Sequence, residues 1–165
     1  MLRASAIEAA GSWSGAPADH VDLVYDDRHR RRIAMHGRSG LVFLLDLVEA
    51  AVLRHGDGLR LEDGRIVEVW AKPERLLDVR GRNAHHLARL AWHLGNRHLP
   101  AAIEPSRILI RPDHVIGAML VGLGAVVTNI EAPFDPEAGA YAAGHSGGHP
   151  ARAAHSAGAH DHRGG

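Results

Sequence analysis

The sequence predicts an α+β protein with a small N-terminal all-β domain, a second domain of βαββαβ order, and a disordered C-terminal tail that contains histidines. Three observations support this prediction. Residues 19–74 alternate apolar and polar side chains between short turn signals, a pattern typical of strands. Residues 75–141 hold two helical patterns among short apolar runs. Residues 142–165 consist mostly of Gly, Ala, Ser and His, with no apolar period.

The first third of the chain holds a weakly patterned start and then strands. Residues 1–18 are rich in Ala, Ser and Gly, and we expect a flexible N-terminus there. Alternation over residues 21–25 predicts a half-buried strand, followed by a turn at an Asp-Asp pair. The basic run RHRRR at 28–32 is most often a solvated strand face or turn, and the neutral net charge favours that interpretation over a nucleic-acid patch.

The rest of the β domain, which we place at residues 19–74, is marked by turns. The apolar run at 41–53 fits a buried strand or a helix, and its periodicity does not decide between them. Asp-Gly pairs at 57–58 and 63–64 are hairpin turn signals, because Gly tolerates positive φ. A proline at position 73 marks the domain boundary.

The second domain, residues 75–141, begins with a strand at 75–79 and a helix at 84–94. The helix has leucines at helical spacing on one face. Asn83 is expected to cap its N-terminus, because an amide oxygen can accept from a free helical N–H. Gly95 suits the left-handed position that closes a helix.

Short strands at 101–104 and 107–110 then form a hairpin-like pair around Pro-Ser. A second helix is expected to begin at Pro112 or Asp113 and to end at one of the glycines near position 123, before a last strand at 125–130. This β-α-β-β-α-β order is the ferredoxin-like arrangement, with both helices on one face of an antiparallel sheet.

Composition excludes several classes of protein. The chain has 165 residues, no cysteine and a formal net charge of zero. Absence of cysteine rules out disulfides and thiolate metal sites, and zero net charge argues against a nucleic-acid binder. No run reaches the ~18 apolar residues of a membrane span, and the N-terminus is too weakly apolar for a signal peptide. We therefore expect a cytoplasmic protein with no nucleic-acid or membrane partner.

Fourteen histidines are the unusual feature of the composition. Imidazole suits nickel, copper and zinc better than calcium or magnesium. The tail histidines are interspersed, unlike the uninterrupted run of an expression tag, and this favours metal capture. The candidate ligands in the tail are His145, His149, His155, His160 and His162.

His98 is the central candidate ligand, because it follows the first predicted helix on an exposed turn. A flexible chain of ~20 residues spans on the order of 25 Å, so tail imidazoles can reach it at an effective concentration of order mM. A two-fold dimer would also bring two copies of His98 together. His114, at the first turn of the second helix, is a further candidate or a plain surface residue, since the helix dipole disfavours its charged form.

The remaining histidines show no metal-ligand spacing. His85, His86 and His93 lack the i, i+4 spacing of helical metal sites, and we expect them at the surface. Four more are dispersed in the β domain: His20, His29, His36 and His55.

No catalytic constellation is present in the sequence. Ser39 and Ser106 lack a nucleophile-elbow setting. The chain has a single lysine, Lys72, and no Walker-type glycine loop. We therefore expect that the protein is not an enzyme.

Several segments together resemble the UreE family of urease accessory nickel metallochaperones. The specific ones are LAWHLGNRHLP at 90–100, AAIEPSRILIRPDHVIGAML at 101–120, PFDPEAGAY at 133–141 and the histidine-containing tail. DDRHRRR and LRHGDGLRLEDGR match more loosely in the N-terminal half. The resemblance covers about residues 20–145.

The resemblance implies a homodimer that carries Ni(II) as cargo, with Zn(II) or Cu(II) possible in vitro. The histidine of the GNRH segment, here His98, would meet its copy at the dimer interface and bind nickel, and tail histidines would add ligands. The β domain would bind protein partners. Those partners would be the urease accessory GTPase and, through it, the complex that matures the urease apoprotein. Some members carry a second histidine where this chain has Pro112, so only His114 remains of that pair.

Three alternatives stay open from the residues alone. One is a general buffer for nickel, zinc or copper that acts mainly through the tail. Another is an enzyme in which a metal at His98 activates water, although the turn offers no acidic residue at useful spacing. The last is a peptide-binding module formed by the β domain.

Overall fold

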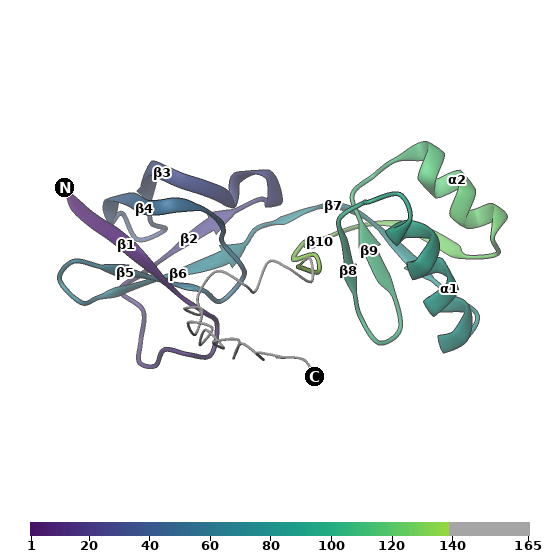
Figure 1. Ribbon diagram of the computed structural model, residues 1–165, viewed down its shortest axis with the longest axis horizontal. Helices are drawn as coiled ribbons and strands as arrows, with labels where there is room; N and C mark the ends of the chain where they lie inside the picture. Colours follow the sequence, from purple (N-terminus) through teal and green to yellow (C-terminus); the bar gives the residue numbers. More distant parts are fainter. Residues whose placement is uncertain (139–165) are drawn as a thin grey trace, which may run out of the picture.

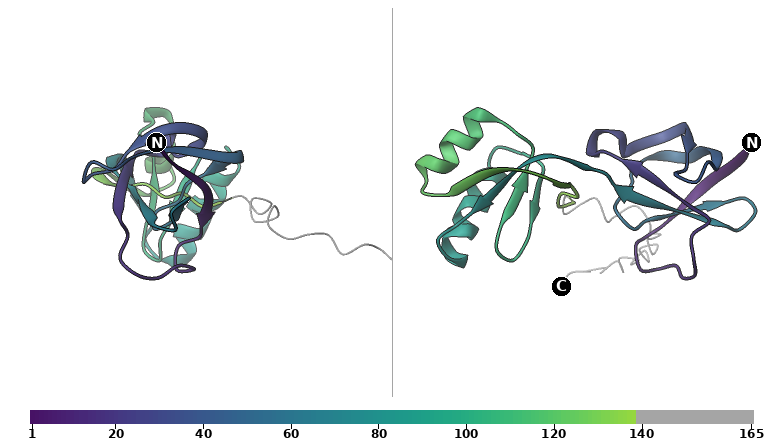
Figure 2. Two further views of the ribbon diagram at one scale, coloured as in Figure 1. Left: turned by 90° about the vertical axis from the view of Figure 1, so that its left-hand side faces the viewer. Right: turned by 180° about the vertical axis from the view of Figure 1, so that it is seen from behind.

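The computed structural model describes residues 1–138 and shows two units (Figures 1 and 2), which are joined at Lys72 between two successive strands. The first unit is built from strands alone apart from one 3-10 turn, and the second has two helices against a sheet. The predicted α+β fold class is confirmed. The tail at 142–165, which we expect to be disordered, lies outside the described residues.

The N-terminal unit is a six-stranded sheet of order β2-β6-β5-β1-β4-β3. Its elements are β1 (Leu2–Glu8), β2 (Asp19–Leu23), the 3-10 turn η1 (Tyr25–Asp27), β3 (His29–His36), β4 (Val42–Val52), β5 (Gly58–Leu61) and β6 (Ile66–Ala71). One face of the sheet encloses a core in which Phe43, Leu59 and Val67 are fully buried.

The expectation of a flexible N-terminus over residues 1–18 is wrong for its first part. β1 lies in the interior of the sheet, parallel to β4 and antiparallel to β5. Ala4 is fully buried, and Leu2 and Ile7 pack against the core. The alternation was hidden because its buried positions include alanine, which contributes little hydropathy.

β4 resolves the ambiguous apolar run as an eleven-residue strand. Phe43, Leu45 and Leu47 are buried on one face, which is the period-two pattern of a strand. Leu44 on the other face is half-buried and apolar, and this masked the alternation. The register with β3 shifts between Asp46 and Ala51, so that β4 bulges there before its last residues pair again.

The two Asp-Gly pairs behave differently. Gly64 has a φ of 86° and joins β5 to the antiparallel β6, which confirms the second predicted hairpin. The hairpin predicted at the first pair, 57–58, is wrong, because β1 lies between β4 and β5 in the sheet. The residue with the left-handed conformation there is Gly56, with a φ of 83°. Asp57 is buried and accepts from the N–H groups of Arg54 and Ala10. Burial raises its pKa.

The C-terminal unit has the predicted βαββαβ order. Its elements are β7 (Pro73–Arg80), α1 (Ala84–Gly95), β8 (Ala101–Ile103), β9 (Ile108–Ile110), α2 (His114–Gly122) and β10 (Val126–Pro133). The sheet has the order β10-β7-β9-β8, with every neighbouring pair antiparallel. Both helices pack on one face, where Leu90, Leu120 and Ile108 are almost completely buried. Neither helix is long and apolar enough to cross a membrane.

His86 is buried, against the expectation of a surface residue. Its Nδ1 accepts from the Arg82 N–H at 3.0 Å, so the ring proton lies on Nε2, which donates to the Leu123 carbonyl at 2.9 Å. The ring thus joins the start of α1 to the end of α2, and only 7% of the residue is exposed. Helical spacing gave no sign of this, because the contacts lie outside α1.

Asp19 lies at the start of the edge strand β2 and connects it to the turn between β3 and β4. Its carboxylate accepts from the N–H groups of His20 at 2.8 Å, Ser39 at 2.9 Å and Leu41 at 3.0 Å. Burial favours a higher pKa, but the three donors outweigh it and lower the pKa of Asp19. An added Cβ at Gly37 would collide with this carboxylate, so glycine is required there.

Replacement of His86 tests the bridge between the helices. His86→Ala leaves the Arg82 N–H and the Leu123 carbonyl without partners inside the protein and opens a cavity, so we expect it to lower the free energy of unfolding by about 2–3 kcal/mol. His85→Ala, at an exposed neighbouring position, is the matched control and should change it by less than about 0.5 kcal/mol. Urea unfolding measures both, and equal effects would contradict the bridge.

Asp19→Asn tests the buried carboxylate through its pH dependence. Because the folded-state pKa is lowered, the carboxylate stabilises the fold above its ordinary pKa, and this contribution is lost as pH falls through the folded value. We expect the variant to be less stable by about 2 kcal/mol near neutral pH. The difference should narrow in acid, and a difference that stays constant in urea unfolding down to about pH 2 would contradict the assignment.

Candidate metal centre

His98 stands on the turn that connects α1 to β8. The helix begins at Asn83, whose side chain accepts from the His86 N–H at 2.8 Å, as the sequence predicts. After the helix, the N–H groups of Arg97 and His98 donate to the carbonyls of Leu94 and Gly95 at 3.0 and 3.1 Å. The imidazole therefore emerges, exposed, from a turn whose backbone is hydrogen-bonded to the helix.

The left-handed residue of this turn is His98 itself, with a φ of 54°, and not Gly95. α1 continues through Gly95, and Asn96 keeps a right-handed conformation. His98 is the only non-glycine residue among residues 1–138 with positive φ. This conformation costs about 1–2 kcal/mol for a residue with a Cβ, and such strain is most often found at functional positions.

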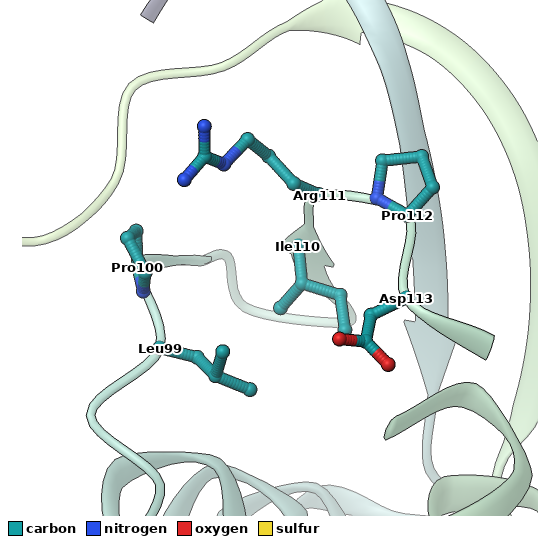
Figure 3. Close-up of a pocket in the computed structure, with 6 residues that line it drawn as sticks. All are labelled: Leu99, Pro100, Ile110, Arg111, Pro112 and Asp113. Atoms are coloured by element: carbon teal, nitrogen blue, oxygen red, sulfur yellow. The ribbon is translucent and has the colours of Figure 1, made fainter. Parts of the chain in front are cut away.

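A hollow of about 350 Å³ lies beside the turn (Figure 3). Leu99 and Pro100 lie across it from Pro112 and Asp113, with Ile110 between them. Leu99 directly follows His98, and Asp113 directly precedes His114. The two candidate histidines of the folded part therefore stand on segments that meet at this hollow.

The charged groups of the hollow are already engaged elsewhere. Arg111 forms an ion pair with Asp26 at 2.6 Å, and its guanidinium lies 5.2 Å from the centre of the Tyr25 ring. Asp113 caps α2, because its Oδ1 accepts from the N–H groups of Val115 and Ile116 at 2.9 and 3.0 Å. The six lining residues thus offer no pair of side chains arranged for acid–base or nucleophilic chemistry.

His114 is the first residue of α2 and is exposed. Asp113, one of the two predicted starting residues of this helix, is its N-cap, so the imidazole projects from the first helical turn.

The described part of the chain does not complete a metal site. Within residues 1–138, no three His, Asp or Glu side chains are arranged to hold an ion. His20 pairs with Glu68 at 3.1 Å and packs on Trp70, and His55 accepts from the Ala71 N–H. These contacts give His20 and His55 structural roles in the β domain. The five candidate tail ligands, residues 145–162, lie outside the described residues.

Sequence reasoning missed two arginines that join the two units. Arg28 belongs to the basic run that we expected to be solvated, yet its side chain is completely buried. It contacts Phe134 and Asp135, just after β10, and Arg54 contacts the same segment. The PFDPEAGAY segment was the available signal, but nothing in it indicates a partner more than 100 residues away.

Comparison with known proteins covers both units. Residues 3–72 match the family model for the N-terminal domain of the UreE urease accessory protein, and residues 74–164 match the model for its C-terminal domain. The two matches meet where β6 ends and β7 begins.

Individual relatives extend over nearly the whole chain. The urease accessory protein UreE of Chelativorans sp. strain BNC1 is 54% identical over 162 residues, which are 98% of this chain and 99% of the relative. That of Rhodopseudomonas palustris strain HaA2 is 58% identical over 147 residues, or 89% and 68% of the two chains. That of Agrobacterium fabrum strain C58 is 48% identical over 149 residues, or 90% and 91%. The chain therefore belongs to the UreE urease accessory protein family.

Proposed function

We propose that this protein is a nickel chaperone without catalytic activity, which binds Ni(II) through His98 and passes it to the urease maturation machinery. Family membership supports a role in urease maturation. The observation that carries the proposal is an exposed imidazole on a hydrogen-bonded turn, in a folded part that does not complete a metal site by itself. Such a position supplies one well-placed ligand and leaves the others to mobile or external groups.

A second copy of the chain is the proposed source of the next ligand. Large apolar side chains are exposed on both helices: Trp92 is 66% exposed on the last turns of α1, and Val115, next to His114, is 63% exposed at the start of α2. Exposed aromatic and aliphatic groups of this kind are typical of the centre of a protein interface. A two-fold dimer formed there would place two His98 imidazoles together.

The tail imidazoles are the proposed source of the remaining ligands. An ion held partly by ligands on a tether can lose them one at a time, which allows transfer without complete dissociation. The proposed receiver is the urease accessory GTPase. Zn(II) and Cu(II) should bind the same imidazoles in vitro, because imidazole affinity follows the general order of divalent metals.

His98→Gly gives the sharpest test of the metal ligand. Glycine removes the imidazole and also relieves the positive φ, so the fold should not be weakened. We expect the tightest nickel affinity to fall at least tenfold in calorimetry, while His85→Ala, exposed at the start of the helix that precedes the turn, leaves it unchanged. Affinity of the wild type should also fall below about pH 6.5, because imidazole must be neutral to bind. Unchanged affinity in His98→Gly would exclude this site.

A full-length chain with alanine at His145, His149, His155, His160 and His162 separates the chaperone from a tail-based metal buffer. We name it the tail-Ala chain. If His98 is the core ligand, the tail-Ala chain should bind fewer nickel ions per chain in equilibrium dialysis. Its affinity for the ion that remains should fall less than this number does. A buffer requires the reverse: tight binding disappears in the tail-Ala chain and persists in His98→Gly.

A further inference from the structure

Residues 134–137 form an extended strap that leaves β10 and crosses the face of the C-terminal sheet that the helices do not cover. Phe134 is completely buried there against Leu76 and Leu109. The sheet order places β10 at one edge and β8 at the other. At its far end the strap reaches β8, where the Glu137 N–H donates to the Ala101 carbonyl at 2.9 Å.

The N-terminal unit holds the middle of the strap with two arginines. Arg28 donates to the Phe134 carbonyl and pairs with Asp135 at 2.7 Å. Arg54 donates to the Pro136 carbonyl at 2.9 Å and lies 3.5 Å from the same carboxylate. A buried guanidinium is costly unless it is paired. The completely buried Arg28 therefore stabilises the molecule only while the strap is in place.

Aromatic contacts reinforce this junction. Tyr25 meets the Phe134 ring edge-on, with centroids 5.3 Å apart, and the guanidinium groups of Arg28 and Arg111 lie 5.5 and 5.2 Å from the centre of its ring. Its N–H donates to Glu74 at 2.9 Å, at the start of β7. Arg28, Arg54 and Tyr25 thus each contact the C-terminal unit or the strap, although the buried Nε of Arg28 has no hydrogen-bond partner within the described residues.

The end of the strap lies beside the candidate metal centre. Ala101 follows His98 by three residues, so the chain between them spans at most about 11 Å. Glu137 also binds this strand through its side chain, which accepts from the Ile103 N–H at 3.4 Å. The chain that continues into the histidine-containing tail therefore starts next to the turn of His98.

We propose that the N-terminal unit positions the tail for metal binding, with Arg28 and Arg54 as positioning residues that anchor its root beside His98. This inference rests on the proposed nickel-binding function and adds a role for the β domain in it. His145 follows Glu137 by eight residues, so it can reach any point within about 28 Å of the anchor. Without the anchor the tether would start at Pro133, at the opposite edge of the sheet, and would be longer.

Weaker anchoring should lower the effective concentration of the tail imidazoles at His98, because effective concentration falls with tether length and with distance between the sites. The relevant quantity is the tail gain, defined as the ratio of nickel affinities of a full-length chain with native tail and its tail-Ala counterpart. A purely structural role for the arginines would leave this ratio unchanged while changing stability.

The test compares Arg54→Gln, Arg28→Met and Arg54→Lys in full-length protein, each with a native tail and a tail-Ala tail. Met replaces the buried guanidinium with an apolar side chain of similar length, and Lys keeps a donor for the Pro136 carbonyl. Arg60→Gln is the matched control, because Arg60 forms an exposed ion pair with Glu8 at 2.6 Å in the same unit without contacting the strap. Hydrogen exchange of the Glu137 amide reports anchoring without any metal.

We expect Arg54→Gln and Arg28→Met to speed exchange of the Glu137 amide at least tenfold and to lower the tail gain by about three- to tenfold. Arg54→Lys should change the exchange rate and the tail gain less than Arg54→Gln does. Arg60→Gln should change neither quantity. Faster exchange with an unchanged tail gain would overturn the positioning role while leaving the nickel proposal intact. Unchanged exchange in both variants would overturn the anchoring itself. A wild-type chain that binds no nickel would overturn the proposed function, and the inference with it.

Discussion

The buried guanidinium of Arg28 is the interaction on which the arrangement of the two units depends. It lies in the N-terminal unit, yet its hydrogen-bonding partners belong to the segment that follows the last strand of the C-terminal unit. A guanidinium buried so completely must stay paired, because an unpaired one in the interior costs several kcal/mol. The junction therefore fixes the course of the chain as far as Glu137, whose N–H donates to Ala101 of β8, three residues after His98.

The second constraint is the left-handed conformation of His98. A strained backbone at an exposed position persists only when its surroundings determine it, and here the preceding helix does so through hydrogen bonds from the turn. The fold thus fixes one imidazole firmly and leaves the coordination sphere open within residues 1–138. That combination suits the nickel chaperone that we propose, since a complete rigid site would hold the ion too long to pass it on.

The sequence predicted most of the second unit because its signals were local. Asn83 caps α1 as expected, α2 starts within one or two residues of the predicted Pro112 or Asp113, and leucine spacing located the buried face of α1. Features that depend on distant partners were missed or misjudged. β1 is recognisable as a strand only from its pairing with β4. The burial of His86 depends on its contact with the end of α2, and that of Arg28 on its contact with Phe134. The exposed turn of His98 was predicted, whereas its positive φ was assigned to Gly95, the residue type that most often adopts it.

The central claim is that His98 and its copy in a second chain hold one nickel ion between them. Native mass spectrometry of the full-length protein, titrated with nickel, measures this stoichiometry directly. The account predicts that the first and most tightly held ion appears on a species of two chains, with one nickel per two copies of His98. A first ion that binds to a single chain, in equal amount with each protomer and without dimer formation, would contradict it.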